Sequence, residues 1–254
     1  MKNIFPIILI SLFVFVSCKK TNVKNAVDIS AIDTLQSNLV EVNEETIMEN
    51  DTTLFDMLMI TSYRIYEGQN PLAKLDNNWL DLYKQNGEFY IKKVDYSIEN
   101  GYDECSGDSL KIINSSRKSL FFMDYKDVRE GKLNKALFKE IDLQVGVKTK
   151  VSFNNTNYEL KVEGIQDSSN SKNYKIILID ENKNEEVIAF EESMTDTYYK
   201  LIFAGDIDKD GKLDLIFEAP RHYEEKRIII LLSSKASPGK KLRKASDISE
   251  SFDC

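Results

Sequence analysis

Apolar and polar residues alternate along most of the chain from about residue 51, and short turn-forming stretches interrupt the alternation. The segment "NWLDLYKQNGEFYIKKVDYSI", residues 78–98, carries such runs on both sides of Asn86-Gly87. Asn and Gly both accept positive φ, so this dipeptide favours a two-residue β-hairpin. Similar runs flank residues 154–157 and 181–184. The pattern predicts a series of antiparallel hairpins.

Two longer apolar runs lie near the C-terminus and extend the same pattern. They are "YYKLIFAGDIDKDGKLDLIFEA", residues 198–219, and "KRIIILLSS", residues 226–234. Recurrent turns between short strands are typical of an antiparallel sandwich, a barrel or partial propeller-like sheets. No repeat of propeller-blade length is present, which disfavours a full propeller. The chain therefore predicts a mainly β domain over residues 51–254, either one unit or two subdomains.

Three segments are harder to interpret. Residues 52–67, "TTLFDMLMITSYRIYE", fit either a short helix or a buried strand. Residues 128–141, "VREGKLNKALFKEI", favour a strand or hairpin. The basic run "KASPGKKLRKAS", residues 235–246, is expected to be a solvated loop rather than a binding patch.

The N-terminus has the features of an export signal. Residues 4–16 are almost wholly apolar, too few to span a bilayer comfortably, and they follow Lys2. The sequence then reads "FVSC", which resembles the lipobox of bacterial lipoproteins, although Phe15 departs from the usual aliphatic residue. The resemblance implies that residues 1–17 are removed and that Cys18 carries the lipid, including acyl chains such as palmitate. An ordinary signal peptide and a membrane anchor are the alternatives.

Composition and charge limit the classes of binding partner that are expected. Residues 18–50 are polar without periodicity and predict the lipidated cysteine followed by a flexible tether. The formal charge is −8, and removal of Lys2 with the signal makes it −8 − 1 = −9. An acidic chain is a poor nucleic-acid binder. The expected partners are the membrane, through the lipid anchor, and an unknown envelope protein or glycan. The expected location is the bacterial cell envelope, facing the periplasm.

Two cysteines remain besides Cys18. An exported chain with an even remainder favours a disulfide, here between Cys105 and Cys254. Closing a loop of roughly 150 residues would contribute at most about 5 kcal/mol in the chain-entropy model. Two free thiols, or pairing of the terminal cysteine with another chain, are the alternatives.

The segment "GDIDKDGKLDLIF", residues 205–217, is the strongest candidate for chemistry. Aspartates at alternate positions of a tight loop can point inward together, and Gly211 permits a sharp turn. A hard cation such as Ca2+ needs six to eight oxygen ligands. The alternative is a solvated acidic turn. The predicted calcium ligands are Asp206, Asp208, Asp210, the backbone carbonyl of Lys212, and Asp214.

This loop resembles the DxDxDGxxD pattern of calcium-binding repeats. An EF-hand would place a glutamate where this chain has Phe217, and helices on both sides. The strand-like flanks instead resemble the strand–loop–strand form of FG-GAP and integrin-type repeats. With "YDEC" at residues 102–105 and the terminal cysteine, the C-terminal half also resembles a group of uncharacterised bacterial lipoproteins. That resemblance implies one calcium site and the Cys105–Cys254 bridge, and no activity.

Signals for catalysis are weak. His222 is the only histidine, and we expect it to be structural, although it could lie near the calcium loop. There is no G-x-S-x-G motif, and "CSGDS" at residues 105–109 is interpreted as a turn. Trp79, with Tyr83, Phe89 and Tyr90, fits a core better than a sugar-stacking platform. We therefore expect a non-enzymatic binding or scaffolding protein. A carboxylate-dependent envelope hydrolase and a carbohydrate-binding module are the alternatives.

Overall fold

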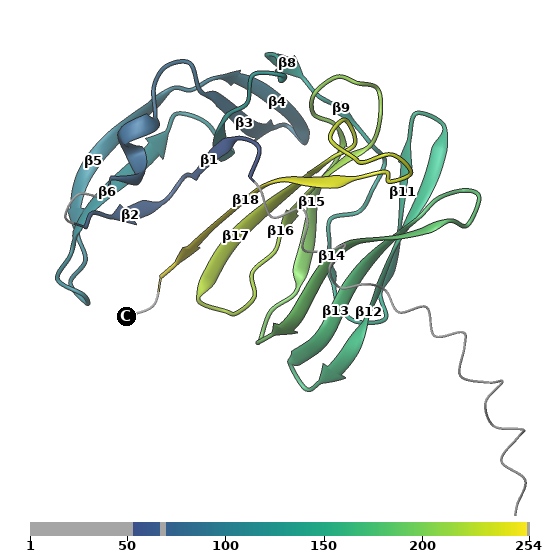
Figure 1. Ribbon diagram of the computed structural model, residues 1–254. Coiled ribbons are helices and arrows are strands. Elements are labelled where there is room, and N and C mark those ends of the chain that lie inside the picture. The colour runs from purple at the N-terminus through teal and green to yellow at the C-terminus, as the bar shows by residue number, and fades with distance from the viewer. Residues whose placement is uncertain (1–52, 67–69, 253–254) are drawn as a thin grey trace, which may run out of the picture. The chain divides into compact units, whose positions relative to one another are not determined.

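The computed structural model describes residues 53–66 and 70–252, which form a mainly β structure (Figure 1). The predicted signal peptide, Cys18, the tether and Cys254 lie outside the described residues. The described residues form four sheets, and all pairings between their strands are antiparallel. None of these sheets closes on itself, so among the predicted architectures the sandwich fits and the barrel does not.

Two sheets contain most of the N-terminal strands. A short 3-10 helix, η1 (Pro71–Lys74), precedes β3 and was not predicted. The five-stranded sheet has, in spatial order, β1 (Asp56–Met59), β7 (Ser119–Asp124), β3 (Leu80–Gln85), β4 (Glu88–Lys93) and β8 (Gly131–Lys132). The three-stranded sheet has β2 (Ser62–Arg64), β6 (Ser109–Ser115) and β5 (Tyr96–Tyr102).

The other two sheets follow in the chain. The six-stranded sheet has β10 (Ile141–Leu143), β15 (Tyr199–Asp206), β16 (Asp214–Glu218), β17 (Glu225–Leu232) and β18 (Arg243–Ser251), with β9 (Asn134–Lys135) pairing β15. The four-stranded sheet has β11 (Lys148–Phe153), β12 (Thr156–Asp167), β13 (Asn170–Ile179) and β14 (Glu185–Met194).

The six-stranded sheet is buried on both faces. Along β17, Ile228 and Ile230 belong to a core shared with the five-stranded sheet, whereas Ile229 and Leu231 belong to a core shared with the four-stranded sheet. Successive side chains of a strand point to opposite faces, so a strand between two cores must be apolar throughout. This explains the unbroken "IIILL" run. A third core lies between the five- and three-stranded sheets and contains Trp79.

The predicted hairpins are confirmed, with one change of boundary. Asn86 and Gly87 join β3 to β4 with φ of 52° and 79°. Residues 180–184 join β13 to β14. The turn expected over residues 154–157 is shorter: Asn154 and Asn155 alone have positive φ, and β12 already begins at Thr156.

The ambiguous segments are resolved by burial. Residues 52–67 contain β1 and β2 and no helix among their described members. Residues 128–141 hold the short strands β8 and β9 and the start of β10. The expectation of a solvated loop for residues 235–246 is wrong at its end, because β18 begins at Arg243 and buries Ala245 and Ser246.

A buried ionic network joins the six-stranded sheet to the four-stranded one. Arg227 on β17 is 7% exposed and donates to both oxygens of Asp247 at 2.9 and 2.7 Å. Its remaining terminal nitrogen donates to Glu191 of β14 at 2.6 Å. The hydroxyl of Tyr199 donates to the same glutamate at 2.5 Å. A buried arginine paired this way needs both carboxylates, because a lone charge in the interior is costly.

The aromatic residues considered as a sugar platform are mainly core. Trp79 is 3% exposed, Tyr83 5% and Phe89 1%. Phe89 packs edge-on against Phe203, with ring centroids 5.0 Å apart. Tyr90 stacks on Tyr83 at 5.5 Å. The core interpretation is therefore confirmed for the first three residues.

Candidate metal centre

The aspartate loop connects β15 to β16, and both of its ends are fixed in cores. Ile207 is 1% exposed and packs in the core shared with the five-stranded sheet, whereas Leu213 is 4% exposed and packs in the core shared with the four-stranded sheet. Gly205 lies near the end of β15, just before the loop, where β9 pairs with this strand. A Cβ atom there would lie 2.2 Å from the carbonyl oxygen of Asn134, so only glycine fits.

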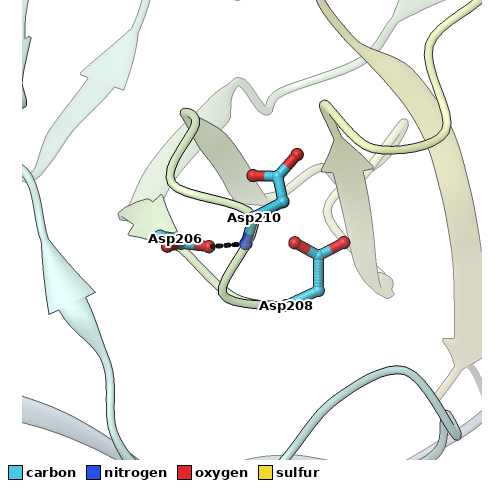
Figure 2. A group of neighbouring side chains, drawn as sticks. All are labelled: Asp206, Asp208 and Asp210. Carbon is cyan, nitrogen blue, oxygen red and sulfur yellow. Dashed lines mark hydrogen bonds between the residues drawn. The ribbon is translucent and has the colours of Figure 1, made fainter.

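Within the loop, three carboxylates come together. Asp206, Asp208 and Asp210 each offer a carboxylate oxygen, and these oxygens lie within 4.8 Å of one another. The Asp206 carboxylate accepts hydrogen bonds from the backbone N–H groups of Asp210 at 3.1 Å and Gly211 at 3.0 Å. Figure 2 shows the first of these bonds, with the carboxylates of Asp208 and Asp210 projecting on the same side of the loop. The predicted alternation of inward-pointing aspartates is therefore present.

Two serines of the β17–β18 connection complete this cluster. The Ser233 hydroxyl lies 3.2 Å from one oxygen of Asp210, and the Ser234 hydroxyl donates to Oδ2 of Asp208. The other oxygen of Asp208, Oδ1, is buried and has no hydrogen-bond partner. A buried acceptor without a donor is costly, so this oxygen is a position where a cation or a water molecule would be stabilising.

Asp214 and Lys212 have a different arrangement from the one predicted. Asp214 is fully buried, and its carboxylate accepts from the N–H groups of Ile207 and Ser233, both at 2.8 Å. It therefore ties the loop to the serine segment and does not join the three-aspartate cluster. Lys212 donates its N–H to Asp210 at 2.8 Å, and its ammonium lies 3.7 Å from the same carboxylate. Metal ligation by Asp214 and by the Lys212 carbonyl stays a prediction.

Burial and mutual repulsion act on these acids. Burial raises the pKa of Asp214 to about 7, against the opposing effect of its hydrogen-bond donors. Burial also raises the pKa of Asp206, and the nearby charges of Asp210 and Asp208 add to the rise. A carboxylate with a raised pKa is one that a nearby cation would stabilise in its charged form. The electrostatics of the loop therefore favour a positive ligand.

The surroundings of the loop are held by longer-range contacts. Lys209 donates to the carbonyl of Glu130 at 3.1 Å, and Lys235, next to the serines, pairs with Asp127 at 2.8 Å. Asn154 of the four-stranded sheet donates to the carbonyl of Gly211 at 2.9 Å. The loop is thus tied to the segment around Glu130 and to Asn154, and the serine segment beside it is tied to Asp127, which gives the cluster a fixed setting.

The donor set decides which kind of ion fits. All donors brought together here are oxygens, from carboxylates and hydroxyls. Oxygen donors suit hard cations, whereas zinc and copper sites in proteins use imidazole or thiolate. The group of Asp206, Asp208 and Asp210 could therefore hold a hard metal ion.

The serines could not have been found by reading the loop alone. They lie more than 20 positions beyond Asp210 and have no motif of their own. They arrive because β16 and β17 form an antiparallel pair, with Leu215 opposite Leu231. This pairing returns the chain to the loop just after Leu232.

The remaining sequence candidates lie elsewhere. His222 follows the far end of β16, whereas the loop precedes that strand, so the suggestion that it lies near the calcium loop is wrong. It forms a bridge with Thr195 instead. The turn expected over residues 105–109 is present between β5 and β6 but lies at residues 104–106, because β6 already begins at Ser109; the Cys105 N–H donates to Asp103 at 3.0 Å. The Cys105–Cys254 bridge stays a prediction.

Comparison with protein-family models, curated proteins and solved structures found no match to this chain. Within residues 53–66 and 70–252, no helix is long and apolar enough to cross a membrane.

Proposed function

We propose that this chain is a lipid-anchored protein of the bacterial cell envelope whose β-domain binds calcium and has a binding or scaffolding role. The observation that carries the calcium proposal is the convergence of Asp206, Asp208 and Asp210, together with an oxygen of Asp208 that is buried without a hydrogen-bond partner. The location rests on the export signal and on Cys18 in the sequence.

Calcium is preferred to magnesium because of the geometry available. Three carboxylates and two serines on two connections form an irregular set, and calcium accepts irregular sets of six to eight oxygens. Magnesium demands a near-ideal octahedron and keeps several of its waters. Backbone carbonyls and water would supply the remaining ligands, with the Lys212 carbonyl and Asp214 as the first candidates.

The role of the ion is to stabilise the loop that joins β15 and β16. An ion that binds the native state and not the unfolded chain stabilises folding by about 2.7 kcal/mol at a concentration of 100 Kd. Without it, the carboxylates of the cluster repel one another. One end of the loop packs in the core shared with the five-stranded sheet and the other in the core shared with the four-stranded sheet. An ion that holds the loop would therefore stabilise the packing of both sheets against the six-stranded one.

The test is thermal unfolding of the full-length chain in detergent, with calcium, with magnesium and after chelation, together with quantification of bound metal. We expect calcium alone to raise the melting temperature, with about one ion per chain. Asp208→Asn should abolish the rise. Asp142→Asn removes the same charge at an exposed position outside the loop and should retain it. An equal rise in wild type and Asp208→Asn would contradict the assignment of the site.

A further inference from the structure

A second candidate site lies at the open end of the β17–β18 hairpin. The aspartate loop lies at the other end of this hairpin, beside the β17–β18 connection. A pocket of about 380 Å3 lies where the start of β17 and the end of β18 meet β2 and the turn between β5 and β6. In Figure 1, the C-terminal end of β18 extends toward the part of the molecule that contains β2. Its volume is within the range of small-molecule sites, about 300–1,000 Å3. The pocket shares no residue with the aspartate loop.

The lining of this pocket includes two groups of opposite charge that form no ion pair among the described residues. Lys226 of β17 and Glu250 of β18 are directly opposite each other in the strand pair, and both line the pocket. Among the described residues, neither side chain takes part in an ion pair or a side-chain hydrogen bond. Glu250 is partly buried, and burial alone raises the pKa of its carboxyl group. Such an acceptor is stabilised by donors from a ligand.

The walls add hydroxyl groups and aromatic rings. Ser62 and Ser251 line the pocket, and each hydroxyl can both donate and accept a hydrogen bond. Tyr66 is 51% exposed and Phe252 is 61% exposed, and both rings border the same space. Exposed aromatic rings beside unpaired polar groups offer a flat apolar surface together with hydrogen-bonding capacity.

We propose that this pocket binds a saccharide unit, with ring hydroxyls on Glu250 and Lys226 and the apolar face of the ring against Tyr66 or Phe252. Neighbouring hydroxyls of one sugar ring can donate to a carboxylate and accept from an ammonium group, so one neutral ligand satisfies both charges. The proposal goes beyond the calcium function and does not depend on it.

The pocket is arranged for binding rather than for glycoside hydrolysis. Hydrolysis in most glycosidases needs two carboxyl groups that are available to the substrate. Asp103 also lines the pocket, but Arg64 donates to its carboxylate at 2.9 Å and the Cys105 N–H at 3.0 Å. The Arg64 hydrogen bond is the main cause that lowers the pKa of Asp103. Glu250 is therefore the single unpaired carboxylate among the described lining residues.

The experiment is ligand-observed NMR and calorimetry on the full-length chain, in a detergent without a sugar headgroup. The probes are glucose, galactose, mannose, N-acetylglucosamine and N-acetylmuramic acid, with glycine and alanine as non-sugar probes. We expect saturable binding of at least one sugar, weakened about tenfold by Glu250→Gln, since the neutral amide accepts a weaker hydrogen bond than the carboxylate. Tyr66→Ala should weaken binding of the same sugar.

Matched controls separate the pocket from general surface effects. Glu99→Gln and Tyr102→Ala alter exposed residues of β5 that do not line the pocket, and they should leave sugar affinity unchanged. Should Glu250→Gln fail to fold, Lys226→Met, at an exposed position, takes its place. Absence of binding by every sugar, binding equal in pocket and control variants, or binding of the amino acids alone would overturn the proposal. The pocket variants should retain the calcium-dependent rise in melting temperature, so failure of the saccharide proposal would leave the calcium proposal standing.

Discussion

Replacing Arg227 with methionine should lower the free energy of unfolding more than any single substitution at the surface. Methionine retains much of the apolar stem of arginine but removes a charge that is 7% exposed. The substitution takes three hydrogen bonds away from Asp247 and Glu191. Breaking a buried ion pair by removing one partner costs about 3–5 kcal/mol, because the remaining charge is left uncompensated. Since domains are stable by about 5–15 kcal/mol in total, this is a large fraction.

The loss should depend on pH, and its sign follows from Asp247. Burial raises the pKa of Asp247, but hydrogen bonds and the charge of Arg227 outweigh this, so its pKa lies below the ordinary value. A carboxyl group with a depressed folded-state pKa contributes stability that is present above its unfolded-state pKa and is lost as the pH falls. Without Arg227, only Lys244, 3.3 Å from the Asp247 carboxylate, still opposes the effect of burial, so the neutral acid is favoured more than in the wild type. The difference between wild type and variant should therefore be largest near neutral pH and shrink on acidification.

The assay is urea unfolding of both proteins near pH 7 and near pH 4.5, with the free energy of unfolding extrapolated to water. Lys226→Met is the matched control, because it removes one positive charge from the adjacent, exposed position of the same strand. It should cost less than about 0.5 kcal/mol. A loss below about 1 kcal/mol for Arg227→Met, or an equal loss at both pH values, would refute the reasoning.

Three further predictions concern the backbone and the cysteines. Gly205→Ala should cost about 3 kcal/mol, because its Cβ would meet backbone atoms, whereas Gly146→Ala, also at positive φ but in open space, should cost about 1 kcal/mol in the same melts. Non-reducing peptide mapping should recover Cys105 joined to Cys254, and alkylation of both without reduction would exclude the bridge. Labelled palmitate should enter the wild-type chain in a bacterial host and not Cys18→Ser; label in both would place the lipid elsewhere, and label in neither would exclude it.

The proposed bridge has a structural argument beyond cysteine counting. Ser251 and Phe252, at the end of β18, line the same pocket as Asp103, which is two positions from Cys105. Cys254 follows Phe252 by two positions in the sequence and lies outside the described residues. A bridge here would fix the C-terminal end of β18 against the turn between β5 and β6, beside the proposed saccharide site.

The sequence by itself determined the local features of this protein. Alternation of period two, with Asn86-Gly87 between two runs, was sufficient for the β3–β4 hairpin, because turn chemistry and side-chain direction are set within a few residues. The spacing of Asp206, Asp208 and Asp210 likewise predicted a converging carboxylate group, because a tight loop brings alternate residues together. Both predictions depend on interactions within one short segment.

Only the tertiary structure decided which segments meet. The end of the basic run, from Arg243 to Ser246, becomes a strand because β17 offers it a partner edge and a core for Ala245, and no local propensity carries that information. Ser233 reaches Asp210 because β17 pairs with β16, and Glu250 and Ser62, from distant parts of the chain, line one pocket. Such pairings are selected by burial of whole sheet faces. A side chain's neighbours across a sheet are therefore fixed by the fold as a whole, whereas its neighbours along a turn are fixed by the sequence.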